Sequence, residues 1–383
     1  MRSLTRIASK VPAFRLVALF LALAPNALAH TTWYVDGVNG NDGNNCRTLT
    51  TACKTIGHAI SLASSGDAIT VAPATYTENL NINLSLSIIG SGATMTIIDG
   101  GQAGTVVTVG QQNIQVTLSR VTIQNGSVQS NGAGITNYGT LTINSSTITA
   151  NSAYTFGGGI MSNNTLTINE STVSGNSLSY EYGSGGGIMI WGTLTVNRST
   201  ITANGAYDGG GIYIASGTAT INNSTVTANS AYYGGGIENF GALTINNGTI
   251  TGNSAPAGAG IYQDAGGSVT FQDSIIANNP GGNCLGAVTS NGYNVSSDNS
   301  CGFNGPGDMN NTSPRLGSLG RYGGPTQTII EMLGSPTVDA GNPNGCTDSQ
   351  GNLLTTDQRG APRPGLHKSD KRCDMGSFER QTD

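Results

Sequence analysis

The chain contains 383 residues, with 16 Lys or Arg against 21 Asp or Glu and a formal net charge of −5. This small acidic excess provides no basic surface for phosphate groups, so nucleic acid is not an expected partner. Glycine is abundant, at 57 residues. Because Ile, Leu and Val recur at regular intervals, we nevertheless expect an ordered chain with a buried core rather than a disordered one.

Residues 1–29 have the pattern of a secretory signal peptide. Basic residues precede an apolar run over 16–24, and the small-residue site 27–29 follows it, so cleavage after Ala29 is expected. The run is too short to cross a bilayer, and no later stretch supplies the roughly 20 apolar residues of a membrane helix. The sequence therefore predicts an exported protein without a membrane span, located outside the cell or at its surface.

A short helical segment follows the mature N-terminus. Apolar side chains over 54–64 have helical spacing, and Gly66 supplies a stop signal. We expect residues 30–79 to form an N-terminal cap and a first rung. The loop 36–43 includes Asp36 and Asp42, which could bind calcium through their oxygens. Their Asn- and Gly-rich surroundings fit tight turns equally well.

Residues 80–280 consist of a repeat of about 25 residues. Its clearest marker is an isoleucine that follows three small residues, Gly-Gly-Gly or Gly-Ala-Gly, found at Ile135, Ile160, Ile188, Ile212, Ile237 and Ile261. Two further runs in each repeat alternate apolar residues with Thr, the period of a strand. Such rungs bury their apolar face only by stacking. The sequence therefore predicts an all-β, right-handed parallel β-helix of about eight or nine rungs with three short strands each.

Two columns of asparagine accompany the repeat. One ends the middle strand, at Asn144, Asn169, Asn197, Asn222 and Asn246, and the other follows the third strand, at Asn151, Asn176, Asn204, Asn229, Asn253 and Asn278. Stacked in register, each column becomes an amide ladder that satisfies bent backbone. We interpret these residues as structural. The threonines of the third strand are expected to face solvent.

The six cysteines fall into three local pairs outside the central repeats. The expected disulfides are Cys46–Cys53, Cys284–Cys301 and Cys346–Cys373. A metal site is disfavoured because the three histidines are scattered. From about Gly281 the repeat pattern fails, so we expect residues 281–383 to form a Pro- and Gly-rich C-terminal capping region.

Three stretches resemble known families. The paired motifs Gly-Gly-Gly-Ile and Ile-Thr-Ala-Asn, over residues 132–279, resemble repeats of the polymorphic outer-membrane protein type, which occur in bacterial β-helical adhesins. The opening, at residues 33–36, 54–56, 66–67 and 76–79, is similar to the N-terminal cap of many right-handed β-helix proteins of the pectin-lyase-like superfamily. The C-terminal part resembles the domain called choice-of-anchor Q, on residues 323–326, 334–341, 357–360 and 373–379. These resemblances imply a β-helix displayed at a surface.

Candidate functional side chains gather near the corner marked by the glycines. Tyrosines suited to stacking on sugar rings occur at Tyr154, Tyr180, Tyr182, Tyr207, Tyr232 and Tyr233, although they could instead stack on one another and shield the corner. Glu181, Asp208 and Glu238 lie in the same region and are the candidate catalytic carboxylates. Glycan-cleaving β-helix enzymes combine such carboxylates with Lys or Arg, which are missing from the sequence around these three.

We therefore expect a monomeric extracellular or cell-surface protein that binds a polysaccharide or surface glycan without a cofactor. We expect it to be non-catalytic, because the sequence lacks a convincing acid–base set. Many identical contacts along a repetitive face favour extended polymers. The alternative function is a polysaccharide lyase or glycoside hydrolase acting through the three carboxylates. A third hypothesis is ice binding by the threonine array, at Thr147 and Thr149, Thr200 and Thr202, Thr225 and Thr227, and Thr249 and Thr251.

Overall fold

The computed structural model describes residues 30–348, 350–365 and 372–381, so the predicted signal peptide lies outside the described residues. The N-terminal cap contains a short 3-10 helix, η1 (Leu49–Thr51), and one α-helix, α1 (Ile56–Leu62). The α-helix lies inside the segment predicted to be helical. Thr55 caps it by accepting a hydrogen bond from the backbone N–H of His58.

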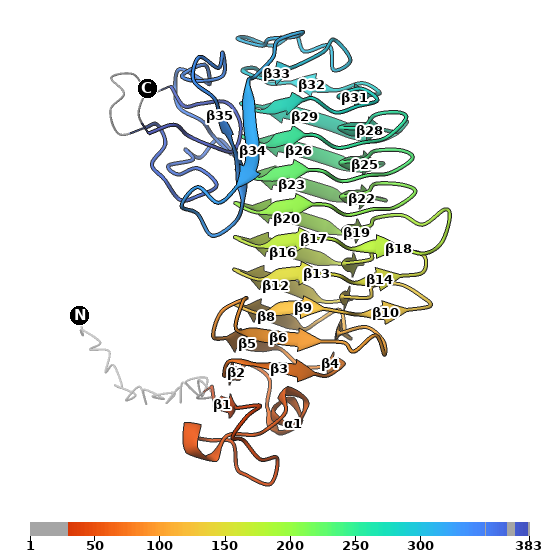
Figure 1. Ribbon diagram of the computed structural model, residues 1–383, viewed down its shortest axis with the longest axis vertical. Helices are drawn as coiled ribbons and strands as arrows, with labels where there is room; N and C mark the ends of the chain where they lie inside the picture. Colours follow the sequence, from red (N-terminus) through yellow and green to blue (C-terminus); the bar gives the residue numbers. More distant parts are fainter. Residues whose placement is uncertain (1–29, 349, 366–371, 382–383) are drawn as a thin grey trace, which may run out of the picture. The chain divides into compact units, whose positions relative to one another are not determined.

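Three long parallel sheets form the solenoid, and successive rungs lie one above the other (Figure 1). Sheet A consists of β1 (Thr32–Val35), β2 (Ala68–Val71), β5 (Leu86–Gly90), β8 (Gln115–Ser119), β12 (Thr140–Asn144), β16 (Thr165–Asn169), β20 (Thr193–Asn197), β23 (Thr218–Asn222), β26 (Ala242–Asn246), β29 (Ser268–Gln272) and β32 (Thr289–Ser290). Sheet B consists of β3 (Ala74–Thr77), β6 (Thr96–Asp99), β9 (Thr122–Gln124), β13 (Thr147–Thr149), β17 (Thr172–Ser174), β21 (Thr200–Thr202), β24 (Thr225–Thr227), β27 (Thr249–Thr251), β30 (Ile275–Ala277) and β33 (Val295–Ser296).

Sheet C closes each rung and consists of β4 (Leu80–Ile82), β7 (Val107–Val109), β11 (Ile135–Asn137), β15 (Ile160–Ser162), β19 (Ile188–Ile190), β22 (Ile212–Ile214), β25 (Ile237–Asn239), β28 (Ile261–Gln263) and β31 (Cys284–Leu285). A small sheet of β10 (Ser127–Val128), β14 (Ser152–Ala153) and β18 (Ser177–Leu178) lines the loops that lead into it. The predicted fold, a parallel β-helix with three strands per rung, is confirmed.

Register between rungs places like residues on like residues. Leu141 pairs with Leu166, which pairs with Leu194, and the isoleucines that follow the glycines form a column with no exposed surface. Burying such a side chain contributes about 1.5–3 kcal/mol relative to leaving it exposed. One core shared by all rungs therefore stabilises the solenoid, and a single rung has too little buried surface to be stable alone.

Both predicted amide ladders form. In the ladder that ends sheet A, the amide of Asn169 donates to Asn144 at 2.9 Å, and later rungs repeat the bond. The second ladder is buried, and its sixth member is Asn279 rather than the predicted Asn278. Asn278 instead has a φ of 56°, as does Ala228, the residue that directly precedes the ladder member Asn229. Two adjacent asparagines made the choice ambiguous in the sequence, and the register of the rungs decides it.

The C-terminal region packs against sheet B of the later rungs. It contains the antiparallel pair β34 (Leu316–Gly320) and β35 (Thr328–Glu331). Gln358 donates to the hydroxyl of Thr200 at 3.0 Å and accepts from that of Thr225 at 2.6 Å. The expectation that these threonines face solvent is therefore wrong for β21, β24 and β27, where Thr200, Thr225 and Thr249 are fully buried. Only earlier rungs of the array remain partly exposed.

Parallel pairing continues past residue 280, through a further irregular turn made by β31, β32 and β33. The three predicted disulfides are present, one in the cap, one in this last turn and one in the C-terminal region. Among the described residues, no helix has the length and apolar character needed to cross a bilayer.

Candidate functional site

The predicted tyrosines, together with Tyr262 of β28, which the sequence reasoning did not include, form one continuous row beside sheet C. We call this row the tyrosine column. Its members are Tyr154, Tyr180, Tyr182, Tyr207, Tyr232, Tyr233 and Tyr262, and each ring contacts the next with centroids 4.8–5.8 Å apart. The rings of Tyr207 and Tyr232 are stacked, 5.0 Å apart and 6° from parallel. This spacing follows from the rise of roughly 4.8 Å between neighbouring strands.

Several tyrosine rings of the column remain exposed to solvent although they stack on one another. Tyr154, Tyr182 and Tyr232 keep 39%, 54% and 46% of their surface exposed, whereas Tyr207 and Tyr233 are half-buried. Aromatic pairs contribute about 0.5–1.5 kcal/mol beyond their buried area. The rings therefore support one another and also present ring faces and hydroxyl groups to solvent. Mutual stacking of the tyrosines is thus compatible with sugar binding by the same residues.

Glu238 is the most perturbed carboxyl group beside the column. It is the middle residue of β25, lies in register between Tyr213 and Tyr262, and is only 3% exposed. Burial raises the pKa of Glu238 to about 8, the charges of Asp208 and Asp264 add to the rise, and a hydrogen bond from the Gly209 N–H opposes it. Its Oε2 has no hydrogen-bond partner. With a pKa near 8, the neutral, protonated form of Glu238 predominates at pH 7.

Asp208 lies close to Glu238, whereas Glu181 does not share this environment. Asp208 precedes β22 at the corner, and its carboxylate accepts a hydrogen bond from the Ser184 hydroxyl at 3.4 Å. Burial raises the pKa of Asp208, and the bond from Ser184 partly opposes this. Glu181 is exposed on the longer loop before β19. Of the three carboxylates singled out in the sequence, two thus influence each other electrostatically.

A hollow on the outer face of sheet C was missed by the sequence reasoning. It has a volume of about 420 Å³ and is lined by Asn131, Tyr138, Phe156, Met161, Asn163 and Trp191. These residues lie on different rungs, so only the register of the solenoid brings them together. A signal was present in the sequence, because Tyr138, Asn163 and Trp191 each follow the last residue of a sheet C strand.

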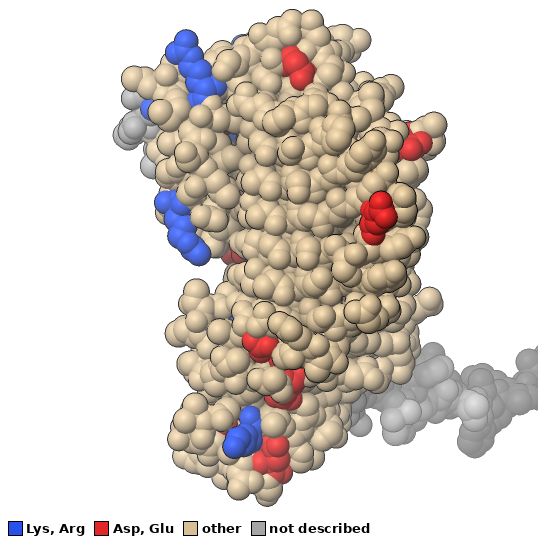
Figure 2. All heavy atoms as spheres, turned by 45° about the vertical axis from the view of Figure 1, so that its right-hand side comes forward, with Lys and Arg blue, Asp and Glu red and all other residues tan. Residues whose placement is uncertain are grey.

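Positive charge is scarce throughout this region. Arg198 is the only Lys or Arg between residues 121 and 314, and it pairs with Glu170 at the turn between sheets A and B. In Figure 2, basic side chains lie at the left of the molecule, and the right-hand part over the rungs shows acidic but no basic ones. A polyanionic ligand would find no counter-charge here.

The candidate calcium ligands in the cap are engaged by the chain itself. Asp36 accepts hydrogen bonds from the backbone of Val38 and Asn39 at 2.9 and 3.0 Å, and the bonds from Asn39 lower the pKa of Asp36. Asp42 accepts from the backbone of Lys54 and Thr55 at 2.8 and 3.0 Å. This arrangement favours the interpretation of the loop as tight turns.

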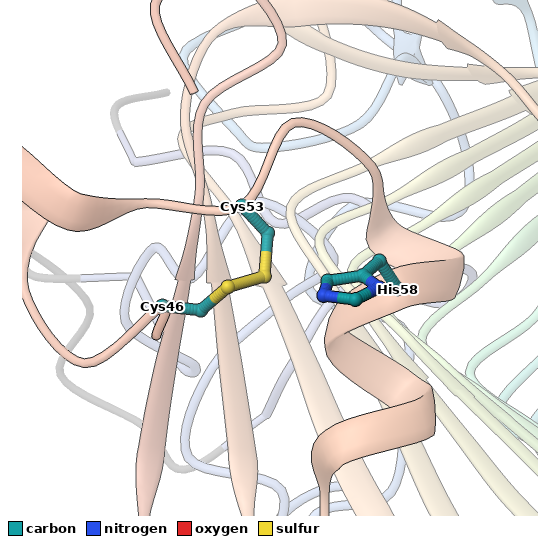
Figure 3. A group of neighbouring side chains, drawn as sticks. All are labelled: Cys46, Cys53 and His58. Carbon is teal, nitrogen blue, oxygen red and sulfur yellow. A yellow bond between two sulfur atoms is a disulfide. The ribbon is translucent and has the colours of Figure 1, made fainter. Parts of the chain in front are cut away.

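His58 lies beside Cys46 and Cys53 (Figure 3), with potential ligand atoms of all three within 4.8 Å of one another. The two sulfur atoms form a disulfide. Because metal ions bind cysteine as the thiolate, this disulfide removes two ligands from the group. The cluster therefore stabilises the cap and does not form a metal site while the disulfide is intact.

The strand order, the stacked rungs and the amide ladders define a right-handed parallel β-helix protein. Residues 104–301, more than half of the chain, match the family model described as "Right handed beta helix region", and the chain belongs to this family. No curated protein shows significant sequence similarity to it.

The pectate lyase Pel9A has a similar fold, at 13% identity and a TM-score of 0.55 over 92% of this chain and 98% of that chain. A rhamnogalacturonan lyase has 10% identity and a TM-score of 0.45 over 80% and 97% of the two chains. XylC in complex with xylose has 9% identity and a TM-score of 0.44 over 91% and 98%. At 13% identity the similarity to Pel9A shows the fold alone.

Proposed function

We propose that the protein is a secreted, non-catalytic β-helix that binds an extended polysaccharide through the tyrosine column. The continuous row of ring contacts from Tyr154 to Tyr262 is the observation that carries this proposal. Ring faces stack on the apolar faces of sugars, and the phenol hydroxyls reach sugar hydroxyls. Several equivalent contacts along one axis favour a polymer over a free sugar.

Export and surface display are part of the proposal. The signal-peptide pattern of residues 1–29 and the three disulfides support an oxidising, extracellular compartment. The resemblance to adhesin repeats and to the choice-of-anchor Q domain supports a protein that holds a glycan or matrix partner at a cell surface. In this role the solenoid acts as a rigid support that spaces the tyrosines along the ligand.

The test replaces the stacked pair, as Tyr207→Ala with Tyr232→Ala, in the mature protein. Affinity electrophoresis against a panel of plant, algal and microbial polysaccharides should show binding by the unchanged protein and weakening of about tenfold or more in the variant, equivalent to roughly 1.4 kcal/mol. The matched pair Tyr207→Phe with Tyr232→Phe preserves stacking and should retain most of the binding. Unchanged affinity in the alanine variant would show that the column is not the binding face.

A second candidate function is hydrolysis of a glycosidic bond, favoured by the neutral state of Glu238. A protonated carboxyl can donate its proton to the leaving oxygen while Asp208 accepts a proton from water. Elimination is disfavoured, because the stretch 199–314, which contains both carboxylates, has no Lys or Arg. This function ranks second since Glu238 is only 3% exposed. Shortening of a polysaccharide, followed by size-exclusion chromatography and lost in Glu238→Gln, would establish it.

A further inference from the structure

The hollow on sheet C is bounded on both sides by aromatic rings from different rungs. Phe156 comes from the loop that leads into β15, and Tyr138 and Trp191 come from the turns that follow β11 and β19. Met161, the middle residue of β15, forms the floor and is only 4% exposed. The volume of about 420 Å³ lies in the range of small-molecule sites, roughly 300–1,000 Å³.

The hollow lies where Asn163 separates two aromatic residues at equivalent positions of neighbouring rungs. In successive rungs, the residues that follow the sheet C strands are Tyr138, Asn163, Trp191, Ala215 and Phe240. Asn163 leaves space between its two aromatic neighbours. Two rungs beyond Trp191 the equivalent residue is Phe240, whose ring contacts that of Tyr213 with centroids 5.4 Å apart. Tyr213 there occupies the surface that Met161 leaves open.

The geometry of the hollow suits a flat ring with polar substituents. The rings of Phe156 and Trp191 meet at 88°, with centroids 5.6 Å apart, and so form two sides of a corner. A six-membered sugar ring can stack on one aromatic plane while its edge contacts the other. The amides of Asn131 and Asn163, which also line the hollow, supply donors and acceptors for hydroxyl groups.

The charges around the hollow restrict the class of sugar. None of its six lining residues is charged, and the single basic residue between 121 and 314, Arg198, is paired at another corner of the rung. A uronate carboxylate would lose hydration here without gaining a cation. We infer that the hollow is a second glycan-binding site, specific for a pyranose unit of an uncharged polysaccharide.

The hollow adjoins the beginning of the tyrosine column. Phe156 is two residues from Tyr154, and the ring of Tyr154 contacts that of Tyr180 at 5.1 Å. A chain that stacks along the column can therefore place one unit in the hollow, which sets the position of the chain on the solenoid. This role in a polymer complex rests on the proposed function, whereas recognition of a short oligosaccharide by the hollow does not.

Tryptophan fluorescence tests the inference directly, because the chain has two tryptophans, Trp33 and Trp191. Trp33 lies on β1, several rungs before the hollow, where it is 6% exposed and donates a 2.9 Å hydrogen bond to Asp67. Titration with short neutral oligosaccharides of glucose, mannose and xylose should shift the emission of Trp191 and protect it from acrylamide. Oligogalacturonates should have no effect. Trp33→Phe should keep the response, and Trp191→Phe should lose it.

Affinity for a neutral polymer provides the second measurement. Trp191→Ala should weaken binding by about tenfold, while the control Phe240→Ala, at the equivalent turn two rungs away, should leave it unchanged. If the polymer binds and depends on Tyr207 and Tyr232 but not on Trp191, the hollow is not a subsite and the proposed function stands. If short neutral sugars move the Trp191 emission while the tyrosine variant binds normally, the hollow is a site and the column is not. A response only to oligogalacturonates would overturn the assignment to neutral glycans.

Discussion

Replacement of Glu238 by Gln should remove a large pH dependence of stability. Because the pKa of Glu238 is raised from 4.5 to about 8, the folded state holds this proton between those values and the unfolded state releases it. The stabilisation is complete below about pH 4.5 and is lost as the pH rises towards about 8, by roughly 1.4 kcal/mol per pH unit and at most about 5 kcal/mol in all. The titratable side chains around the Glu238 carboxyl group are those of Asp208, Asp264, Tyr213 and Tyr262.

Urea unfolding of the wild type and of Glu238→Gln at several pH values measures this effect. The two should differ by about 1 kcal/mol or less near pH 5, and the variant should be several kcal/mol more stable near pH 9, since Gln stays uncharged. Glu181→Gln, at an exposed carboxylate on the loop before β19, is the control and should follow the wild type. Parallel stability curves for wild type and Glu238→Gln would refute the raised pKa and the reasoning from burial.

Two further predictions concern the scaffold. Asn204→Ala should lower the free energy of unfolding in urea by about 2–5 kcal/mol, because it leaves two buried donors of Asn176 without the Asn204 Oδ1 acceptor. Asn197→Ala, in the partly exposed ladder, should lower it less. Equal losses in the two variants would contradict the role of burial. Thr225→Val removes a hydroxyl that bonds Gln358 and Ser377, so limited proteolysis should cut the C-terminal region faster. Thr147→Val, in the same column of sheet B but only partly buried, should not, and equal cleavage of both variants would argue against docking through Thr225.

Much of the candidate site could be predicted, because aligning the repeats in the sequence shows which residues occupy equivalent positions on neighbouring rungs. Once the isoleucines that follow the glycines are aligned, Tyr207 and Tyr232 must occupy equivalent places on neighbouring rungs. Glu170 and Arg198 also follow equivalent strand ends on neighbouring rungs, and their side chains form an ion pair. The alignment did not place Glu181, whose rung has a longer loop, or distinguish Asn278 from Asn279 in a rung where two asparagines are adjacent.

The sequence by itself determined the architecture, since period-two strands, glycine corners and asparagine columns recur with one spacing and only a parallel stack satisfies all of them. Only the tertiary structure decided which faces are free. The C-terminal region covers the later threonines through Gln358, the backbone of Gln327 and Ser377, a contact between segments far apart in the chain that no local pattern encodes. The hollow at Trp191 likewise depends on side chains from three rungs, whose sizes and orientations combine only when the rungs are stacked.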